Sequence, residues 1–452
     1  MGPKGDGERV RDIEQIRVSP PEILIIGTLD TKSVEIGAVA GHVESLGGSV
    51  LLLDTSGRAH PGRSSTDLAF GRHVITREEV AAAAGKKRGE VEALPRGESV
   101  ATMRIGVAEH VKRLHCEGAI DGAICVGGAG AYVARDAFAA LPVGFPKLIV
   151  SPLASGSRIF EPYVGTRDVA ILHSVADIVG INPVTSAIYR TAAGYIVGAA
   201  RAAVRTADGS SKQTIVMSMN GNTTPALILA KEALERAGWS IVAFHANGVG
   251  GRALEEFVAT GAAAGVLDYT TTELAGREIG GLMDAGPDRM ETAGRLGIPQ
   301  VLVPGCLDFI TCGPKASAEV EFPGRKMFMH NPELTLIRLT SDEMSEMGRI
   351  FAGKANRAIG PVVICVPLRG LSVNDAEGGL FWDPVADEAF TKALERYLEP
   401  KVTLHLLPHH INDEQFVNRV LEELLAILPD LDGQSTMTAL HGRSPNDSHV
   451  PR

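Results

Sequence analysis

The sequence has few cysteines and no long apolar run. Its five cysteines, in a chain of 452 residues, are odd in number and form no C-x-x-C pair, so neither a disulfide framework nor a zinc knuckle is indicated. No segment has the roughly 18 consecutive apolar residues that a membrane-spanning helix needs. The polar start of the chain also lacks the apolar core of a signal peptide. We therefore expect a cytoplasmic protein that does not bind membranes.

Dense basic clusters and metal-binding patterns are missing as well. The net charge is −10, and the short basic run Lys86-Lys87-Arg88 lies in a polar stretch, which argues against a nucleic-acid partner. His405 and His409 would share a helix face, but Pro408 interrupts that segment, so no metal site is predicted. The absence of a G-x-S-x-G sequence disfavours a hydrolase with a nucleophile elbow.

What the chain does contain is an internal repeat. Segments 22–54 and 213–245 align without a gap, and each reads as an apolar strand, a polar loop, an amphipathic helix and a second apolar strand. The correspondence continues downstream, where 121–128 matches 264–271 and 144–150 matches 297–303 in the same order. The retained order favours an internal duplication.

The length of the chain fits two domains better than one core. We predict an α/β protein with two Rossmann-like domains, whose short apolar runs are typical of mostly parallel sheets covered on both faces. The predicted division is a disordered start (1–20), a first domain (21–205), a linker (206–213), a second domain (214–431) and a disordered tail (432–452). The expected strands are 23–26, 50–53, 123–126, 148–150, 215–219, 241–244, 265–267, 300–303, 334–338, 362–366 and 402–406, with helices at 100–114 and from near 412.

Polar loops follow the predicted strands of the first domain, where parallel sheets bind their ligands. After the first strand come Thr28, Asp30, Thr31 and Lys32. Free amides at a helix start, together with the charge of Lys32, would form a phosphate cradle, with Asp30 able to hold Mg²⁺ through water. The alternative is that Asp30 or Thr31 simply caps the helix.

Further candidates follow the next strands of the same domain. They comprise glycines that would let an anion approach the backbone, a loop of small polar residues, and a cation beside a carboxylate: Gly127, Gly128, Ser155, Gly156, Arg167 and Asp168. Arg167 would neutralise charge on the ligand; the alternative is a surface pair between Arg167 and Asp168.

The second domain is richer in such residues. Gly248, Gly250 and Gly251 would form a backbone nest for an anion, with His245 beside it as a proton donor or as a structural residue. The candidates for proton transfer are His245, Asp268, Glu273 and Asp308. The candidates for binding are Asn220, Thr223, Gly248, Gly250, Gly251, Arg252, Thr271 and Arg369.

These motifs together resemble a known family. The loops GTLDTK (27–32), NGNTTP (220–225), HANGVGGRA (245–253) and GVLDYTTTELAG (265–276) are similar to those of the family formed by the ATP-binding half of a tomato tobamovirus-resistance protein and its bacterial and fungal relatives. The resemblance implies two Rossmann-like domains, ATP binding and a homodimer. The loop GGAGAY (127–132) departs from the family pattern.

Three functional hypotheses remain open. The first is a nucleotide-binding protein, namely an ATP-dependent enzyme that acts on a small molecule at a site in an interdomain cleft. In this hypothesis Mg²⁺ would bind together with ATP. The second is an ATP-independent hydrolase or lyase that cleaves a small oxo-acid or diketone. The third is an interaction or regulatory protein. Carboxylates, histidine and glycine nests at strand ends argue against the third.

Overall fold

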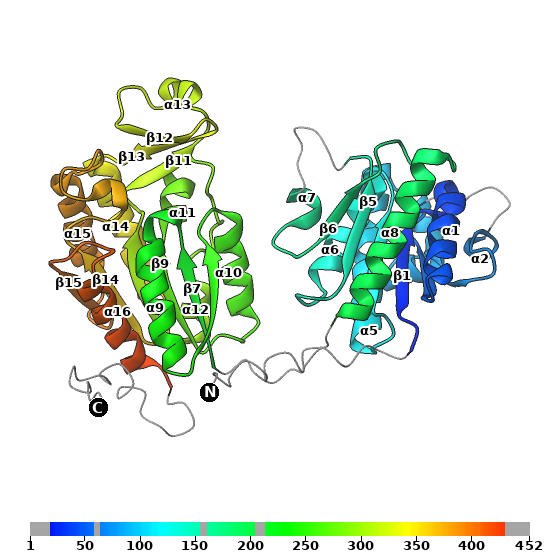
Figure 1. Cartoon of the computed structure of the whole chain (residues 1–452), viewed down its shortest axis with the longest axis horizontal. Helices are drawn as coiled ribbons and strands as arrows, with labels where there is room; N and C mark the ends of the chain where they lie inside the picture. The colour runs from blue at the N-terminus through cyan, green and yellow to red at the C-terminus, as the bar shows by residue number, and fades with distance from the viewer. Residues whose placement is uncertain (1–18, 58–63, 154–160, 204–212, 430–452) are drawn as a thin grey trace, which may run out of the picture. The chain divides into compact units, whose positions relative to one another are not determined.

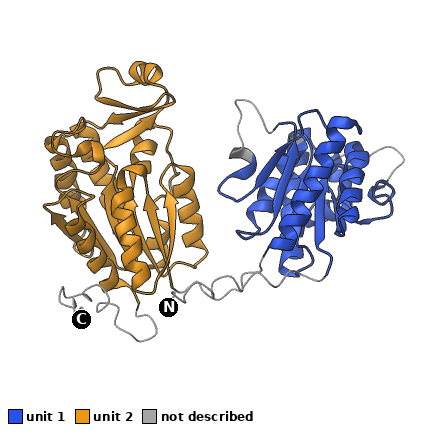
Figure 2. Ribbon diagram, in the orientation of Figure 1, with its two compact units in different colours: residues 1–206 blue, residues 207–452 orange. Residues whose placement is uncertain are grey.

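The computed structural model describes residues 19–57, 64–153, 161–203 and 213–429. The candidates Ser155 and Gly156 lie outside these ranges. So do the predicted disordered ends and linker, apart from residues 19, 20 and 213. The chain divides into two compact units, unit 1 (Met1–Thr206) and unit 2 (Ala207–Arg452), coloured separately in Figure 2. Each unit is an α/β body of its own (Figure 1).

The sheet of unit 1 is wholly parallel and has six strands in the order β3-β2-β1-β4-β5-β6. The strands are β1 (Glu22–Gly27), β2 (Ser49–Asp54), β3 (His73–Ile75), β4 (Gly122–Val126), β5 (Lys147–Ser151) and β6 (Ala170–His173). This is the strand order of a dinucleotide-binding fold, and it reverses direction between β1 and β4. The two loops that leave β1 and β4 therefore diverge and open a crevice.

Helices cover both faces of this sheet because alternate strand residues point to opposite sides. Ile23 and Ile25 pack toward α1 and α8, whereas Leu24 and Ile26 pack toward α3, α5 and α6. The helices are α1 (Leu29–Ser45), α2 (Ser65–Leu68), α3 (Arg77–Ala83), α4 (Arg88–Glu92), α5 (Arg96–Cys116), the 3₁₀ turn η2 (Ala129–Val133), α6 (Ala134–Ala139), α7 (Glu161–Val164) and α8 (Pro183–Ala202).

The main sheet of unit 2 is also parallel, in the order β15-β14-β10-β9-β7-β8. Its strands are β7 (Thr214–Met219), β8 (Ser240–His245), β9 (Gly265–Thr270), β10 (Gln300–Gly305), β14 (Val362–Pro367) and β15 (Thr403–Leu407). The run β8-β7-β9-β10 repeats the run β2-β1-β4-β5 of unit 1, strand for strand. The repeat found in the sequence thus corresponds to a repeated topology.

A small antiparallel sheet interrupts unit 2 between β10 and β14. It has the order β11-β13-β12, with β11 (Phe309–Cys312), β12 (Met327–Asn331) and β13 (Leu334–Arg338). The predicted strand 334–338 exists, but it lies here and not in the main sheet. The short strands β3, β6, β11 and β12 were not predicted, because three to five residues give too little alternation to be recognised.

The helices of unit 2 also pack on both faces of the main sheet. Ile215 and Met217 share a core with α9 and α16, whereas Leu302 and Ile364 share one with α14 and α15. The helices are η4 (Gly221–Thr223), α9 (Thr224–Arg236), α10 (Val249–Ala259), α11 (Thr272–Ala275), the π turn η5 (Gly276–Gly280), α12 (Thr292–Leu296), α13 (Lys315–Glu321), α14 (Ser341–Asn356), η6 (Val373–Asp375), α15 (Pro384–Tyr397) and α16 (Glu414–Ile427).

Two further features of the fold concern the buried cysteines and the length of the helices. Cys125 and Cys365 are buried in strands, and burial raises the pKa of each thiol to about 12, so both thiols stay protonated in the core. Among the described residues, none of the helices is long and apolar enough to cross a membrane.

Candidate functional site

A cavity of about 930 Å³ opens in unit 1 at the carboxyl ends of β1 and β4. Gly27 ends β1, and Gly127 and Gly128 follow β4, so the cavity lies at the point where the strand order reverses. A Cβ atom at Gly27 would lie 2.5 Å from Cδ1 of Ile36. A larger residue where the chain leaves β1 would have to displace the Ile36 side chain, so glycine fits best there.

Most of the predicted unit 1 residues that are described line this cavity. These are Thr28, Asp30, Thr31, Lys32, Gly127 and Gly128. Arg167 and Asp168 are not among the lining residues. Asp168 instead accepts a hydrogen bond from the amide of Gly144 (2.7 Å) and pairs with the buried ammonium of Lys147 (2.8 Å). These contacts tie Asp168 to the loop before β5 and to Lys147, away from the lining of the cavity.

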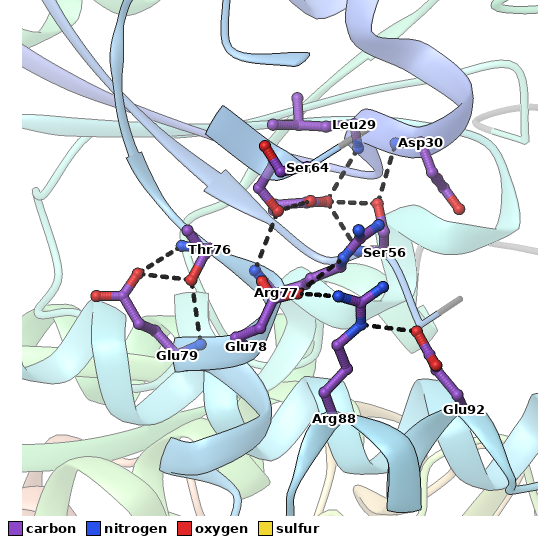
Figure 3. A network of polar contacts seen from close by, with 12 residues as sticks. Leu29, Asp30, Ser56, Ser64, Thr76, Arg77, Glu78, Glu79, Arg88 and Glu92 are labelled. Atoms are coloured by element: carbon purple, nitrogen blue, oxygen red, sulfur yellow. Dashed lines mark hydrogen bonds and ion pairs between the residues drawn. The ribbon is translucent and has the colours of Figure 1, made fainter. Parts of the chain in front are cut away.

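The start of α1 is occupied by acceptors of the chain itself. The amide of Leu29 donates to Oδ1 of Asp54 (3.1 Å), and the amide of Asp30 donates to Oγ of Ser56 (3.1 Å). The next two amides bond to the carbonyl oxygen of Thr28. Figure 3 shows Leu29, Asp30 and Ser56 joined in this network. The predicted phosphate cradle at this helix start is thus filled internally.

Asp54 also bears on the kind of nucleotide that unit 1 can hold. An acid at the end of the second strand contacts the ribose in many dinucleotide folds. Asp54 ends β2, but it is fully buried and also accepts hydrogen bonds from Ser56 and from the hydroxyl of Ser65 (2.6 Å). Its carboxylate therefore holds the loop after β1 and does not face a ligand.

Lys32 is anchored as well. Its ammonium donates to the carbonyl oxygen of Ile178, although the side chain lines the cavity. The positive charge near α1 is therefore partly used within the protein.

The sequence reasoning missed the cations on the other wall of the cavity. Arg96, Ser99 and Arg104 of α5 line it, together with Tyr132 and Tyr163. The guanidinium carbon of Arg104 lies 5.2 Å from the ring centroid of Tyr132, and its Nε pairs with Asp136 (2.8 Å). The predicted helix began at residue 100, so Arg96 and Ser99 were read as loop. Pro95 next to the true start was the available signal.

In unit 2 the predicted glycine nest exists, but the chain supplies its anion. The amides of Gly248 (2.6 Å) and Gly251 (3.0 Å) both donate to Oε1 of Glu273. A Cβ atom at Gly251 would lie 2.1 Å from Oε2 of the same carboxylate. The nest thus binds an anion as its geometry predicts, and that anion is Glu273.

Glu273 belongs to a buried ion cluster around Arg289, which is fully buried. Nε of Arg289 donates to Glu273 (2.6 Å), and Nη2 donates to Asp268 (2.7 Å). Glu255 lies 3.6 Å from Nη1 and accepts amide hydrogen bonds from Met290 and Thr292. Burial alone would lower the pKa of Arg289, but the surrounding carboxylates hold it well above its usual value. Asp268 and Glu273 were predicted to transfer protons, and these ion pairs favour a structural role for both.

Asp308, the last predicted acid, lies in a second buried cluster. It accepts a hydrogen bond from the hydroxyl of Ser372 (2.9 Å), and Arg338 pairs with Asp387 (2.6 Å) and lies 3.6 Å from Asp375. Burial raises the pKa of Asp308; burial and the neighbouring acids raise that of Asp375 to about 9. Burial raises the pKa of Asp387 to about 6, although Arg338 opposes this. One guanidinium faces three carboxyls, so Asp375 keeps its proton at neutral pH.

This cluster predicts a stability that falls as pH rises. Because the folded-state pKa of Asp375 is raised, the folded protein binds more protons than the unfolded chain from about pH 4 to about pH 9. The free energy of unfolding therefore decreases across that window. Asp375→Asn keeps an acceptor for the amide of Leu371 and removes the titration. We expect the variant to be more stable than the wild type at the alkaline end.

Urea unfolding at several pH values checks this expectation. Asp288→Asn is the control, because Asp288 is exposed and forms a surface ion pair with Arg295 (2.7 Å). It should follow the wild-type pH dependence. Parallel curves for Asp375→Asn and the wild type would contradict the proposed proton.

Several other predicted residues of unit 2 are hydrogen-bonded within that unit. Asn220 accepts from the amide of Asn222 (3.1 Å), Thr223 contacts the hydroxyl of Thr270 (2.8 Å), and Thr271 donates to the carbonyl oxygen of Val303 (3.3 Å). These threonines are buried, whereas His245 and Arg369 are exposed and Arg252 is half-buried. A Cβ at Gly250 would lie 1.8 Å from the carbonyl oxygen of His245. Among the residues with described positions, no group of three or more His, Cys, Asp and Glu forms a metal site.

Comparison with known sequences places the chain in a family. The pattern of the Uncharacterised protein family (UPF0261) N-terminal domain matches residues 21–205, and that of its C-terminal domain matches residues 212–428. The chain belongs to this family. A UPF0261 protein of Clostridium tetani is 37% identical over 410 residues, which cover 90% of this chain and 99% of that protein.

Relatives of the chain include tomato proteins, as the motifs indicated. The ToMV susceptible protein tm-1(GCR26) of Solanum lycopersicum is 34% identical over 428 residues, which cover 90% of this chain but 56% of the tomato protein. The chain thus spans little more than half of that relative. Among solved structures, the UDP-N-acetylglucosamine 2-epimerase from Rickettsia bellii is 11% identical, covering 90% of this chain and 96% of that one, with a TM-score of 0.22. A similarity this weak carries no argument.

Proposed function

We propose that this protein binds a nucleotide, namely ATP, in the cavity of unit 1. The observation that carries the proposal is the position of the cavity, at the switch point of a parallel sheet whose strand order is that of dinucleotide-binding folds. Its volume of about 930 Å³ falls in the range of small-molecule sites, which is about 300–1,000 Å³.

The lining of the cavity suits the parts of a nucleotide. Arg96 and Arg104 supply positive charge for phosphates, and the anchored Lys32 adds a cation on the facing wall. Tyr132 and Tyr163, whose ring centroids lie 6.2 Å apart, supply aromatic surface for a base. Asp30 is the acidic residue of the described lining and fits either a hydrated Mg²⁺ on the phosphates or a hydrogen-bond donor of the ligand.

The alternative of an ATP-independent hydrolase or lyase has less support. It relies on His245, Asp268, Glu273 and Asp308. His245 is exposed, but the three carboxyls are buried and already bonded within unit 2. A regulatory protein is disfavoured by the cations and the carboxylate that line the cavity. The homodimer remains a prediction from the family resemblance.

Isothermal titration calorimetry with ATP, with and without Mg²⁺, tests the proposal. We expect saturable binding with a Kd below about 1 mM. Gly128→Leu should abolish it, because a Cβ at Gly128 meets no atom within 4 Å and the added side chain would enter the cavity.

Gly89→Leu is the matched control for that variant. A Cβ at Gly89 also meets no atom within 4 Å, and Gly89 does not line the cavity. It should bind ATP as the wild type does. Absence of heat from wild-type protein at millimolar ATP, or equal binding by both leucine variants, would overturn the proposal.

A further inference from the structure

The two walls of the unit 1 cavity differ in charge and in the number of backbone amides without an acceptor. This difference bears on the orientation of a bound ligand. The α1 wall carries Asp30 and the anchored Lys32, and its helix-start amides already have acceptors. The α5 wall carries Arg96 and Arg104. The sequence had pointed to the α1 wall as the phosphate site.

The start of α5 offers amides that the start of α1 does not. The first helical hydrogen bond of α5 runs from the amide of Ser99 to the carbonyl oxygen of Pro95 (2.9 Å). The amides of Arg96, Gly97 and Glu98 precede it and have no acceptor among the described residues. Arg96, Gly97 and Ser99 line the cavity. A 21-residue helix therefore presents its positive end to the ligand space.

The cations of this wall lie on one face of the helix. Arg96, Val100 and Arg104 follow at intervals of four residues, and all three line the cavity. Arg96 is exposed and has no ion-pair partner within the described parts of the chain. Arg104 is held in place by the ring of Tyr132 and by Asp136. A phosphate chain lying along this face would meet two guanidinium groups in succession.

Two buried polar atoms, one on a buried residue and one on a half-buried residue, point independently to a ligand. Thr55 lines the cavity and is 4% exposed, yet its hydroxyl has no hydrogen-bond partner in the described structure. Oδ1 of Asp30, on the opposite wall, is likewise buried and without a partner there. A buried polar atom without a partner costs about 1–3 kcal/mol. Both atoms are therefore suited to hydrogen bonds from a ligand, and Asp30 requires a donor.

We infer that a bound nucleotide places its phosphates against the start of α5 and its ribose hydroxyls or base amino group against Asp30. This inference rests on the proposed function. A carboxylate repels phosphate and accepts hydrogen bonds from O–H and N–H groups, whereas the α5 wall offers guanidinium groups and amides. The orientation is thus opposite to the one that the α1 loop suggested.

A matched pair of arginine variants tests the orientation. Arg104 and Arg135 lie against the same ring, 5.2 Å and 5.9 Å from the Tyr132 centroid, but only Arg104 lines the cavity. We expect Arg104→Ala to weaken ATP binding about tenfold or more and to leave adenosine binding nearly unchanged. Arg135→Ala should change neither. Arg96→Ala, an exposed position that cannot disturb the core, should behave as Arg104→Ala does.

Asp30 and Lys32 complete the design. Asp30→Ala should weaken ATP and adenosine by the same factor, whereas Lys32→Ala should weaken ATP less than threefold. Inorganic triphosphate should compete with ATP on the wild type and lose this ability in Arg104→Ala. Loss of ATP binding in Lys32→Ala, with normal binding in both α5 variants, would place the phosphates at α1 and overturn the inference. Failure of wild-type protein to bind ATP would instead remove the proposed function itself, and the orientation with it.

Discussion

Arg289→Met is expected to destabilise unit 2 by about 3–5 kcal/mol. Arg289 is fully buried and bonds to Asp268 and Glu273, which are themselves buried. Methionine fills much of the same volume but leaves these carboxylates without a cation in the interior. Such uncompensated charge is costly because the interior solvates it poorly.

Urea unfolding followed by tryptophan fluorescence measures this effect. Trp239 and Trp382 both lie in unit 2, so the signal reports on that unit. Arg277→Met is the control, because Arg277 forms an exposed pair with Asp284 (3.3 Å), and exposed pairs contribute about 0–1 kcal/mol. A loss for Arg289→Met no larger than that of the control would show that the buried cluster does not hold unit 2 together.

Gly106→Ala is expected to destabilise unit 1 by about 1–3 kcal/mol or more. Gly106 lies in the middle of α5, where a Cβ atom would lie 1.9 Å from the carbonyl oxygen of Val80 at α3. Backbone atoms cannot move aside as a flexible side chain can. The added methyl group would therefore push α5 away from α3, and with it the cavity wall that carries Arg96 and Arg104.

A second helical glycine gives a control of opposite sign. Gly194 lies inside α8, and a Cβ there meets no atom within 4 Å. Gly194→Ala should stabilise the protein by about 0.5–1 kcal/mol, because alanine loses less backbone entropy in a helix. Chemical denaturation followed by circular dichroism compares the two. A gain in stability for Gly106→Ala like that expected for Gly194→Ala would contradict the close approach of α5 to α3.

The sequence was sufficient to place the longer strands of the two main sheets and the loops at their carboxyl ends, because buried parallel strands read as continuous apolar runs. It could not show which polar groups satisfy one another within the fold. The nest amide of Gly251 and the carboxylate of Glu273 are 22 positions apart, and Arg289 is 21 positions from Asp268. No local pattern links such pairs, so Asp268 and Glu273 read as candidates for catalysis.

The cationic wall escaped the sequence reasoning for a different reason. The first turn of α5 contains Arg96, Gly97 and Glu98, which give no apolar periodicity, so the predicted helix began with Val100. Helix ends are set by backbone and packing more than by the hydrophobic pattern. For β13 the limit is another one. The sequence pattern of a strand does not show whether the strand joins a parallel or an antiparallel sheet.

Glu273 has a consequence for how unit 2 responds to its surroundings. Because this carboxylate is part of the chain, it competes for the amides of Gly248 and Gly251 at an effective concentration set by the fold and not by the solution. A dissolved phosphate or carboxylate would have to displace the Glu273 carboxylate, which Arg289 also binds. We therefore expect the occupancy of this glycine nest to be independent of the anion concentration in solution.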